Sequence, residues 1–98
     1  MNVTDRITHL RRKIYVHSTL YYRFCTSIIE DSTFDKWAYE LAELQRAYPE
    51  ESKTTLFAAE FAGWDGTTGY DLPWNSWAVR TAEYLREMSQ SDDNVYLL

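Results

Sequence analysis

The sequence predicts a mainly α fold, in which an antiparallel helical hairpin (about 5–24 and 32–48) precedes a turn-rich C-terminal extension and a last helix (about 75–88). Apolar residues repeat at steps of three, four and seven in the helical stretches. The link between the first two stretches is short, which makes those helices antiparallel neighbours. Only three Gly and two Pro occur among 98 residues, which disfavours a disordered chain.

Each helix of the hairpin has one apolar face and recognisable ends. The first face consists of Ile7, Leu10, Ile14, Tyr21 and Phe24. The second consists of Phe34, Trp37, Leu41, Leu44 and Tyr48. Thr4 and Asp31 are the predicted N-caps, and Pro49 supplies the second stop. We expect at least one of Ile28 and Ile29, in the link, to close the open end of the hairpin.

The second half of the chain is less regular. The spacing of Phe57, Phe61 and Trp64 predicts a short helix over about 54–62, and a hairpin through Asp65-Gly66 is the alternative. The last predicted helix has Trp77, Thr81, Tyr84 and Met88 on one side. We expect the extension to be sealed against the hairpin by Trp64, Tyr70, Trp74 and Trp77. The expected organisation is one domain over 1–98, with the hairpin at 5–50, the aromatic-rich extension at 51–88 and a tail at 89–98, polar and frayed over 89–94.

Composition and charge narrow the classes of function. The net charge is −5, although residues 1–24 hold five basic residues against one acid. We expect this basic segment to pack beside its acidic neighbour, and we do not expect direct binding to nucleic acid. The single cysteine, Cys25, and the absence of a long apolar run predict a cytoplasmic protein away from membranes. His9 and His17 lack further ligands at metal-site spacing, and a buried, inert Cys25 is favoured over a nucleophile activated by His17.

The most informative residues lie where the two helices of the hairpin meet. Tyr21 and Tyr22 end the first helix, and Asp31, Phe34 and Asp35 begin the second. Aromatic faces stack on flat or cationic rings, and carboxylates accept hydrogen bonds from ribose hydroxyls or an amide. A cationic nicotinamide with its ribose would suit both features. The alternative is structural: Asp31 only caps its helix, while Tyr21 and Phe34 only pack.

These residues also carry a resemblance to a known family. Residues from about Ile7 to Glu50 resemble the N-terminal Ia domain of bacterial NAD+-dependent DNA ligases. The ordered marks are Leu10-Arg11, Tyr21-Tyr22, Ile29, the D-x-x-[YF]-D pattern at 31–35, Leu41 with Leu44, and the terminal Tyr-Pro-Glu at 48–50. The resemblance covers a little under half of the chain and implies a helical module for the nicotinamide mononucleotide (NMN) half of NAD+.

The resemblance implies which residues contact the ligand. Tyr21, Tyr22, Asp31, Phe34 and Asp35 would line a nicotinamide ribose pocket, with NMN or NAD as the cofactor. The family usually has Tyr at the position of Phe34, and a lost hydroxyl costs roughly 0.5–1.5 kcal/mol of net hydrogen bonding. Two further departures are Cys25 in place of an acid and Ser27 in place of Pro.

The catalytic half of such a ligase is not recognisable in this sequence. None of Lys13, Lys36 and Lys53 begins a Lys-x-Asp-Gly signature. We therefore expect a non-enzymatic, stand-alone relative, possible in a phage genome and then located in the host cytoplasm. Two hypotheses of function follow. One is a binder of a nicotinamide nucleotide; the other is an acidic protein–protein interaction module, for example an inhibitor of a host enzyme or defence complex that imitates nucleic acid.

Overall fold

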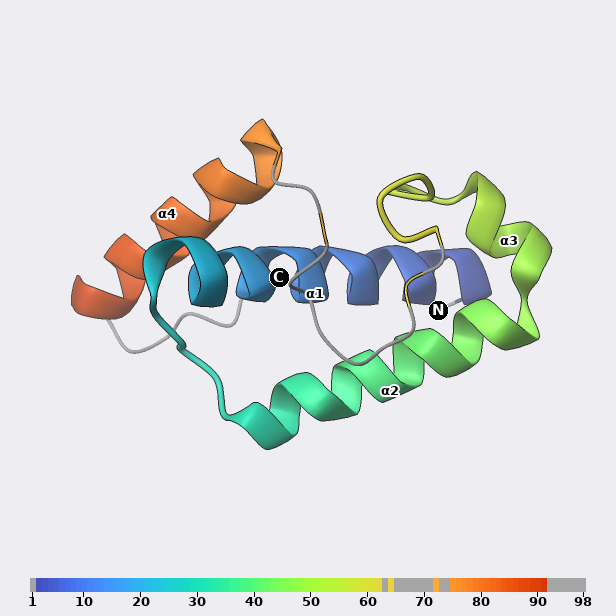
Figure 1. The fold of residues 1–98 in the computed structure, drawn as a ribbon, viewed down its shortest axis with the longest axis horizontal. Coiled ribbons are helices and arrows are strands. Elements are labelled where there is room, and N and C mark those ends of the chain that lie inside the picture. The colour runs from blue at the N-terminus through green and yellow to red at the C-terminus, as the bar shows by residue number, and fades with distance from the viewer. Residues whose placement is uncertain (1, 63, 65–71, 73–74, 92–98) are drawn as a thin grey trace.

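A computed structural model of the chain describes residues 2–62, 64, 72 and 75–91. These residues form the helices α1 (Val3–Phe24), α2 (Asp31–Ala47), α3 (Pro49–Thr54) and α4 (Ser76–Ser91), and none of them is in a strand. α2 runs back antiparallel to α1, as Figure 1 shows. The prediction of a mainly α chain built on a helical hairpin is therefore confirmed. No helix in the described ranges is long and apolar enough to cross a membrane.

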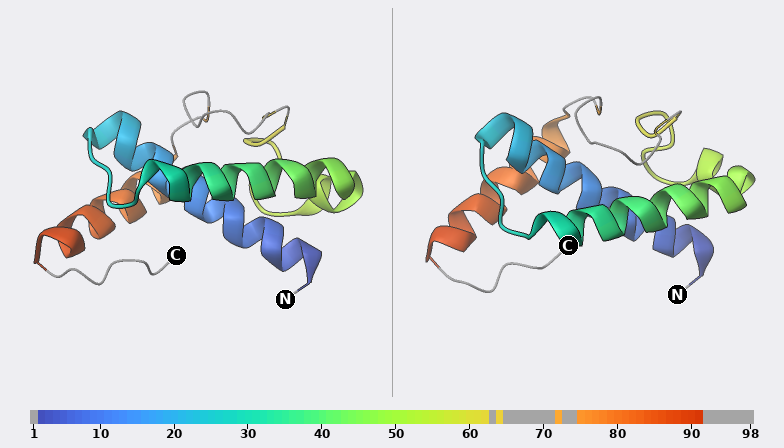
Figure 2. Two further views of the ribbon diagram at one scale, coloured as in Figure 1. Left: turned by 90° about the horizontal axis from the view of Figure 1, so that it is seen from below. Right: turned by 60° about the horizontal axis from the view of Figure 1, so that its bottom comes forward.

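α1 is the central helix of the molecule. Every residue from Ile14 to Leu20 is buried, so this part of the helix is covered on all sides. α2 and α4 both contact α1, and within the described residues they do not contact each other. Figures 1 and 2 show the two helices on different sides of α1. α2 thus covers one face of α1, and α4 covers another face along the C-terminal half of α1.

Two apolar clusters hold these helices together. The buried members of the first cluster include Ile7, Leu10, Ile14, Tyr15, Ala38, Leu41 and Phe61. The second cluster joins Val16 and Leu20 of α1 to Ala82 and Leu85 of α4. Ile28, in the link between α1 and α2, packs against this second cluster of α1 and α4 residues.

The ends of α1 and α2 differ in detail from the sequence prediction. Asn2, and not Thr4, caps α1: its Oδ1 accepts a hydrogen bond from the Asp5 N–H at 2.9 Å. Glu30, and not Asp31, is the N-cap of α2, and its side chain makes no capping hydrogen bond. Asp31 is instead the first helical residue, where its charge is favourable next to the helix N-terminus. Its carboxylate is therefore not needed to cap the helix.

The basic start of the chain packs against α2. The Arg6 guanidinium donates two hydrogen bonds to the Glu40 carboxylate, each 2.7 Å long. The Lys13 ammonium lies 4.5 Å from the ring centroid of Trp37. The expectation that this segment packs beside its own acidic neighbour is confirmed at the Arg6–Glu40 pair.

The predicted helix over 54–62 is wrong. α3 ends at Thr54, and the following residues up to Ala62 form turns. The buried guanidinium of Arg11 on α1 explains this. It can only donate hydrogen bonds, and it donates to the carbonyl oxygens of Ser52, Thr55 and Leu56 at 2.9–3.2 Å. A regular helix would use these carbonyls for its own hydrogen bonds. The alternative turn at 65–66 lies outside the described residues.

α4 confirms the predicted last helix and is longer than predicted. Asn75 caps it, since Asn75 Oδ1 accepts from the Ala78 N–H at 2.7 Å. The helix continues to Ser91, so the prediction of a frayed segment is wrong for 89–91. Tyr84 is 54% exposed, because α4 packs through its small residues and Leu85. Trp64 and Trp77 pack on the core as predicted, whereas Tyr70, Trp74 and the tail beyond 91 lie outside the described residues.

Candidate functional site

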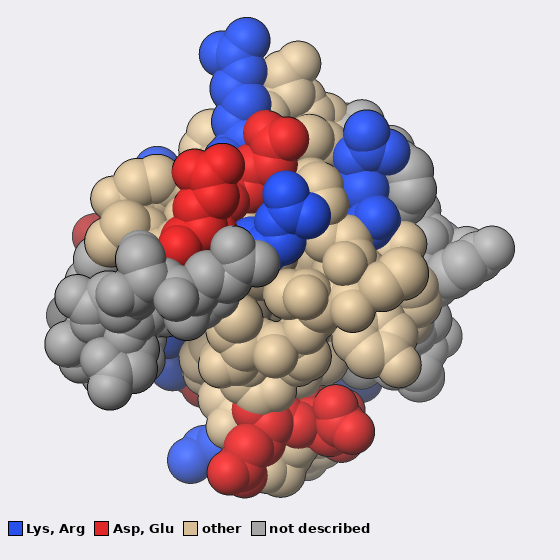
Figure 3. Space-filling model, turned by 90° about the vertical axis from the view of Figure 1, so that its left-hand side faces the viewer, with Lys and Arg blue, Asp and Glu red and all other residues tan. Residues whose placement is uncertain are grey.

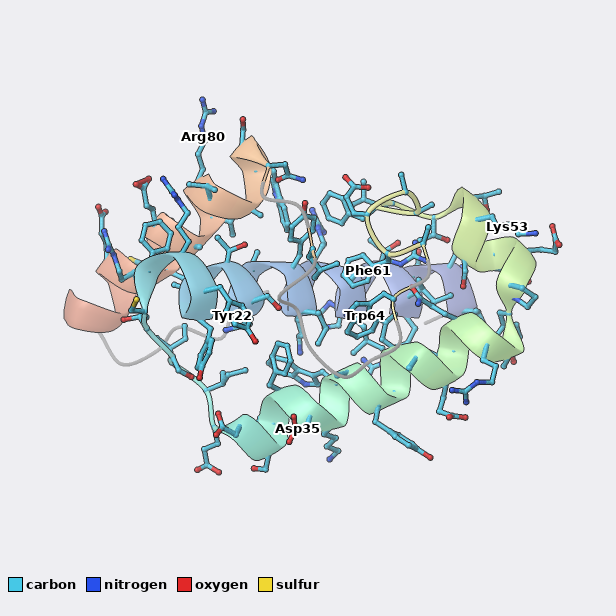
Figure 4. The ribbon with its side chains drawn as sticks, in the orientation of Figure 1. Tyr22, Asp35, Lys53, Phe61, Trp64 and Arg80 are labelled. Atoms are coloured by element: carbon cyan, nitrogen blue, oxygen red, sulfur yellow. The ribbon has the colours of Figure 1, made fainter. Side chains whose placement is uncertain are left out.

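A cavity of about 270 Å³ lies at the end of the hairpin where α1 ends and α2 begins. Figure 4 shows Tyr22 near the end of α1 and Asp35 near the start of α2, on the two helices that bound this cavity. Ten residues line it: His17, Ser18, Tyr21, Tyr22, Ser27, Ile29, Glu30, Asp31, Phe34 and Asp35. All five site residues predicted from the sequence are among them, so the structure brings the paired tyrosines and the two acids together.

The C-terminal end of α1 positions its side chains through a tight reversal. Cys25 adopts a left-handed conformation (φ 51°), and both its N–H and that of Thr26 donate to the Leu20 carbonyl. Such a residue ends a helix and turns the chain sharply, a position that usually holds Gly. The chain can then return to the cavity within the short link, where Ser27 and Ile29 join the wall.

The start of α2 presents its side chains by helical spacing. Asp31, Phe34 and Asp35 stand at i, i+3 and i+4, which places them on one face of the first turns. The backbone N–H groups of Thr33 and Phe34 donate to the Glu30 carbonyl at 3.0 and 3.2 Å. Within the described residues the carboxylates of Asp31 and Asp35 make no hydrogen bond or ion pair, so they are available to a ligand.

The aromatic part of the site combines exposed and half-buried rings. Tyr21 and Tyr22 pack edge to face, with centroids 4.9 Å apart and an interplanar angle of 75°. Tyr21 is 56% exposed and Tyr22 37%, while Phe34 is half-buried. Exposed tyrosine faces beside a cavity can stack on a flat ring. Tyr21 therefore packs on Tyr22 and is also accessible from the cavity side.

The inner wall is polar and uncharged. His17 is 7% exposed, and burial, followed by the field of Lys13, lowers its pKa to about 4. The imidazole is neutral at physiological pH, with one nitrogen donating and the other accepting. Ser18 is 3% exposed, and its Oγ has no hydrogen-bond partner in the described part of the chain. A buried hydroxyl without a partner is costly, and a bound ligand could satisfy it.

The rim of the cavity is acidic. Glu30, Asp31 and Asp35 line it, and none of the ten lining residues is Lys or Arg. Figure 3 looks onto this end of the molecule and shows acidic side chains gathered at its lower edge, over the start of α2. Three carboxylates around one cavity favour a cation over an anion. In the described ranges, no three His, Cys, Asp or Glu side chains are grouped so that they could hold a metal ion.

Half of the residues that line the cavity were not predicted from the sequence. His17 and Ser18 are two of these, although they lie one turn before Tyr21 and Tyr22 and therefore share their side of α1. That spacing was a usable signal. Cys25 is exposed, which contradicts the predicted buried thiol, and it is not among the lining residues.

Fold and site together define a small helical module with an acidic, aromatic cavity between its first two helices. The chain belongs to the family of DNA ligase-like, N-terminal NAD+-binding domains, whose match covers residues 1–54. This range includes α1, α2, α3 and every residue that lines the cavity, whereas α4 lies outside it.

A curated relative agrees with the family. The chain is 42% identical over 50 residues to a DNA ligase of Chlorobium phaeobacteroides (strain DSM 266 / SMG 266 / 2430). This alignment covers 51% of the chain but 7% of the ligase, so the chain spans a small part of that relative. No solved structure matches the chain.

Proposed function

We propose that the chain is a non-enzymatic binding protein that holds NMN, or the nicotinamide half of NAD+, in the cavity between α1 and α2. The observation that carries this proposal is the convergence of Tyr21, Tyr22, Asp31, Phe34 and Asp35 on one cavity, inside the segment that matches an NAD+-binding domain. The cavity volume of about 270 Å³ suits a ring with its sugar better than a whole dinucleotide.

Each lining group has a task in this proposal. The tyrosine faces stack on the cationic pyridinium ring. The carboxylates of Asp31 and Asp35 accept hydrogen bonds from the ribose hydroxyls, and they also attract the ring's positive charge. His17 and the unpartnered Ser18 hydroxyl provide neutral donors and acceptors for the carboxamide. The residues present therefore fit the nicotinamide half of the cofactor.

The non-enzymatic part of the proposal rests on the lysines. Transfer of an adenylate to the protein needs a lysine nucleophile. Lys13 lies over Trp37, and Lys53 forms an ion pair with Glu50. Neither these two nor Lys36 lines the cavity. We infer that residues 1–98 bind the nucleotide without reacting with it.

Isothermal titration calorimetry with NMN and NAD+ tests the proposal, with Asp31→Asn as the variant. Asp5→Asn is a matched control, because Asp5 is an exposed acid in the first turn of α1 and loses the same favourable interaction with a helix N-terminus. We expect NMN to bind the wild type and the Asp5→Asn control alike, and Asp31→Asn to bind at least 10-fold more weakly.

Absence of binding by the wild type at millimolar NMN and NAD+ would refute this function. A stable complex with a host protein, unaffected by NMN, would then support the alternative of an acidic interaction module.

A further inference from the structure

We infer that the cavity recognises the nicotinamide ring and its ribose and gains nothing from the 5′-phosphate, so that the chain binds nicotinamide riboside at least as tightly as it binds NMN. This inference rests on the proposed function and names the part of the ligand that the site reads. It follows from the charges that surround the cavity, which suit the pyridinium ring and oppose a phosphate.

The lining residues offer a phosphate no positive partner. A phosphate monoester carries a charge of about −1.5 to −2 at neutral pH, and proteins bind it with Arg, Lys or free backbone N–H groups. The cavity has three carboxylates, from Glu30, Asp31 and Asp35, and neither Lys nor Arg among its lining side chains. A 5′-phosphate at this rim would meet like charges.

The N-terminus of α2 does not replace a basic side chain. Free N–H groups at a helix start are a common anion site. Here the N–H groups of Thr33 and Phe34 donate to the Glu30 carbonyl, and the acidic side chains of Glu30 and Asp31 stand at the same helix end. The carboxylates of Glu30 and Asp31 therefore oppose an anion at this end of the helix.

Cations near the site are few and can be named. The Lys13 ammonium lies over Trp37. The guanidinium groups of Arg23 and Arg86 lie 5.7 and 4.6 Å from the ring centroid of Phe24. Lys36 follows Asp35 and is exposed. None of these four residues lines the cavity. The residues outside the described ranges contain neither Lys nor Arg and include four Asp, so they add no basic side chain.

The buried wall reinforces this selectivity. His17 and the Ser18 hydroxyl, which has no partner among the described residues, are neutral groups that suit a carboxamide or a sugar hydroxyl. The aromatic rings of Tyr21 and Tyr22 suit a flat cation. The lining side chains thus offer a phosphate neutral hydrogen-bond donors but no positive charge, whereas they offer the ring both aromatic faces and carboxylates.

Calorimetric titrations of the full chain with nicotinamide riboside, NMN and inorganic phosphate test the inference at low ionic strength. We expect the riboside to bind between one and ten times as tightly as NMN, and inorganic phosphate to leave riboside binding unchanged. Raising the salt concentration should weaken riboside binding, because it screens the attraction between the ring and the carboxylates.

Asp35→Asn, with Asp5→Asn as its control, tests whether the carboxylates of the cavity cause the preference for the riboside. Loss of the Asp35 charge weakens an attraction to the ring and relieves a repulsion from the phosphate, so the preference for the riboside should fall about 2- to 5-fold. The Asp5→Asn control should keep the wild-type preference, since Asp5 does not line the cavity.

The outcomes separate this inference from the proposed function. NMN binding that is measurably tighter than riboside binding would overturn the inference and leave the proposed function intact. Lys13→Gln, Lys36→Gln, Arg23→Gln or Arg86→Gln would then identify the phosphate-binding cation as the variant that removes the difference. Failure of both ligands to bind would overturn the inference together with the function on which it rests.

Discussion

The buried imidazole of His17 makes the stability of the protein depend on pH. Burial lowers the pKa of His17 from 6.5 to about 4, so between these values the unfolded chain holds a proton that the folded chain does not. The contribution of neutral His17 to the free energy of unfolding is therefore fully present above about pH 6.5 and is lost as the pH falls toward 4. With 1.36 kcal/mol per pKa unit, acidification from pH 7.5 to pH 5 should cost about 2 kcal/mol through this residue.

Urea unfolding followed by circular dichroism measures this effect in the wild type and in His17→Gln. The variant carries an amide that does not titrate. The quantity to compare is therefore the change in the free energy of unfolding between pH 7.5 and pH 5, and not the absolute stability of either protein. His9, whose pKa is lowered by burial, and Glu40, whose pKa is lowered by Arg6, act in both proteins and cancel. The wild type should lose about 2 kcal/mol more than the variant. Equal losses would refute the assignment of a buried, neutral His17.

Two further substitutions test the packing and the ligand contacts. Arg11→Met should lower the free energy of unfolding by about 3 kcal/mol, because it leaves three backbone carbonyls without their donor. Two of these carbonyl oxygens lie 2.9–3.0 Å from the guanidinium. Urea unfolding measures this loss, and a change below about 1 kcal/mol would contradict the prediction. Phe34→Tyr should strengthen NMN binding about 2- to 10-fold, since it adds the hydroxyl that the family usually carries there. Calorimetry measures this gain, with Tyr84, exposed on α4, as the site of a Tyr→Phe control that leaves the affinity unchanged.

Local sequence patterns were sufficient for the hairpin and for its site. The apolar spacing located α1 and α2 within two residues at each end, because most of the predicted apolar face of each helix packs on the core. Tyr21 and Tyr48, also predicted on these faces, are exposed. The site residues stand at helix ends joined by a short link, so their proximity follows from connectivity alone. For this reason Phe34 and Asp35 line the cavity, as the sequence predicted.

The errors arose where distant contacts decide the local structure. The turns after Thr54 depend on the guanidinium of Arg11, more than 40 residues earlier in the chain. Phe57 has a positive φ of 66°, unusual for a residue with a side chain, and its ring packs 5.0 Å from that of Tyr15. Neither contact has a signal in the local spacing of apolar residues, which predicted a regular helix there.

The packing of α4 depends on residues that large-residue spacing does not reveal. Trp77 and Met88 of the predicted side pack against the clusters, but the helix also contacts α1 through Ala78 and Ala82, whose small side chains allow close approach. Tyr84 of the predicted side is exposed. The inner cavity wall was also missed, because His17 and Ser18 are buried and polar, and their role depends on the neighbouring helix.

An NMR titration with NMN, followed through backbone amide shifts in a 15N-labelled chain, tests the central claim most directly. If the cavity between α1 and α2 holds the nicotinamide half of the ligand, saturable shifts should concentrate on residues 17–35 and leave α4 unchanged beyond its contact with α1. Shifts that concentrate on the outer surface of α4, or a spectrum that NMN does not change, would contradict it.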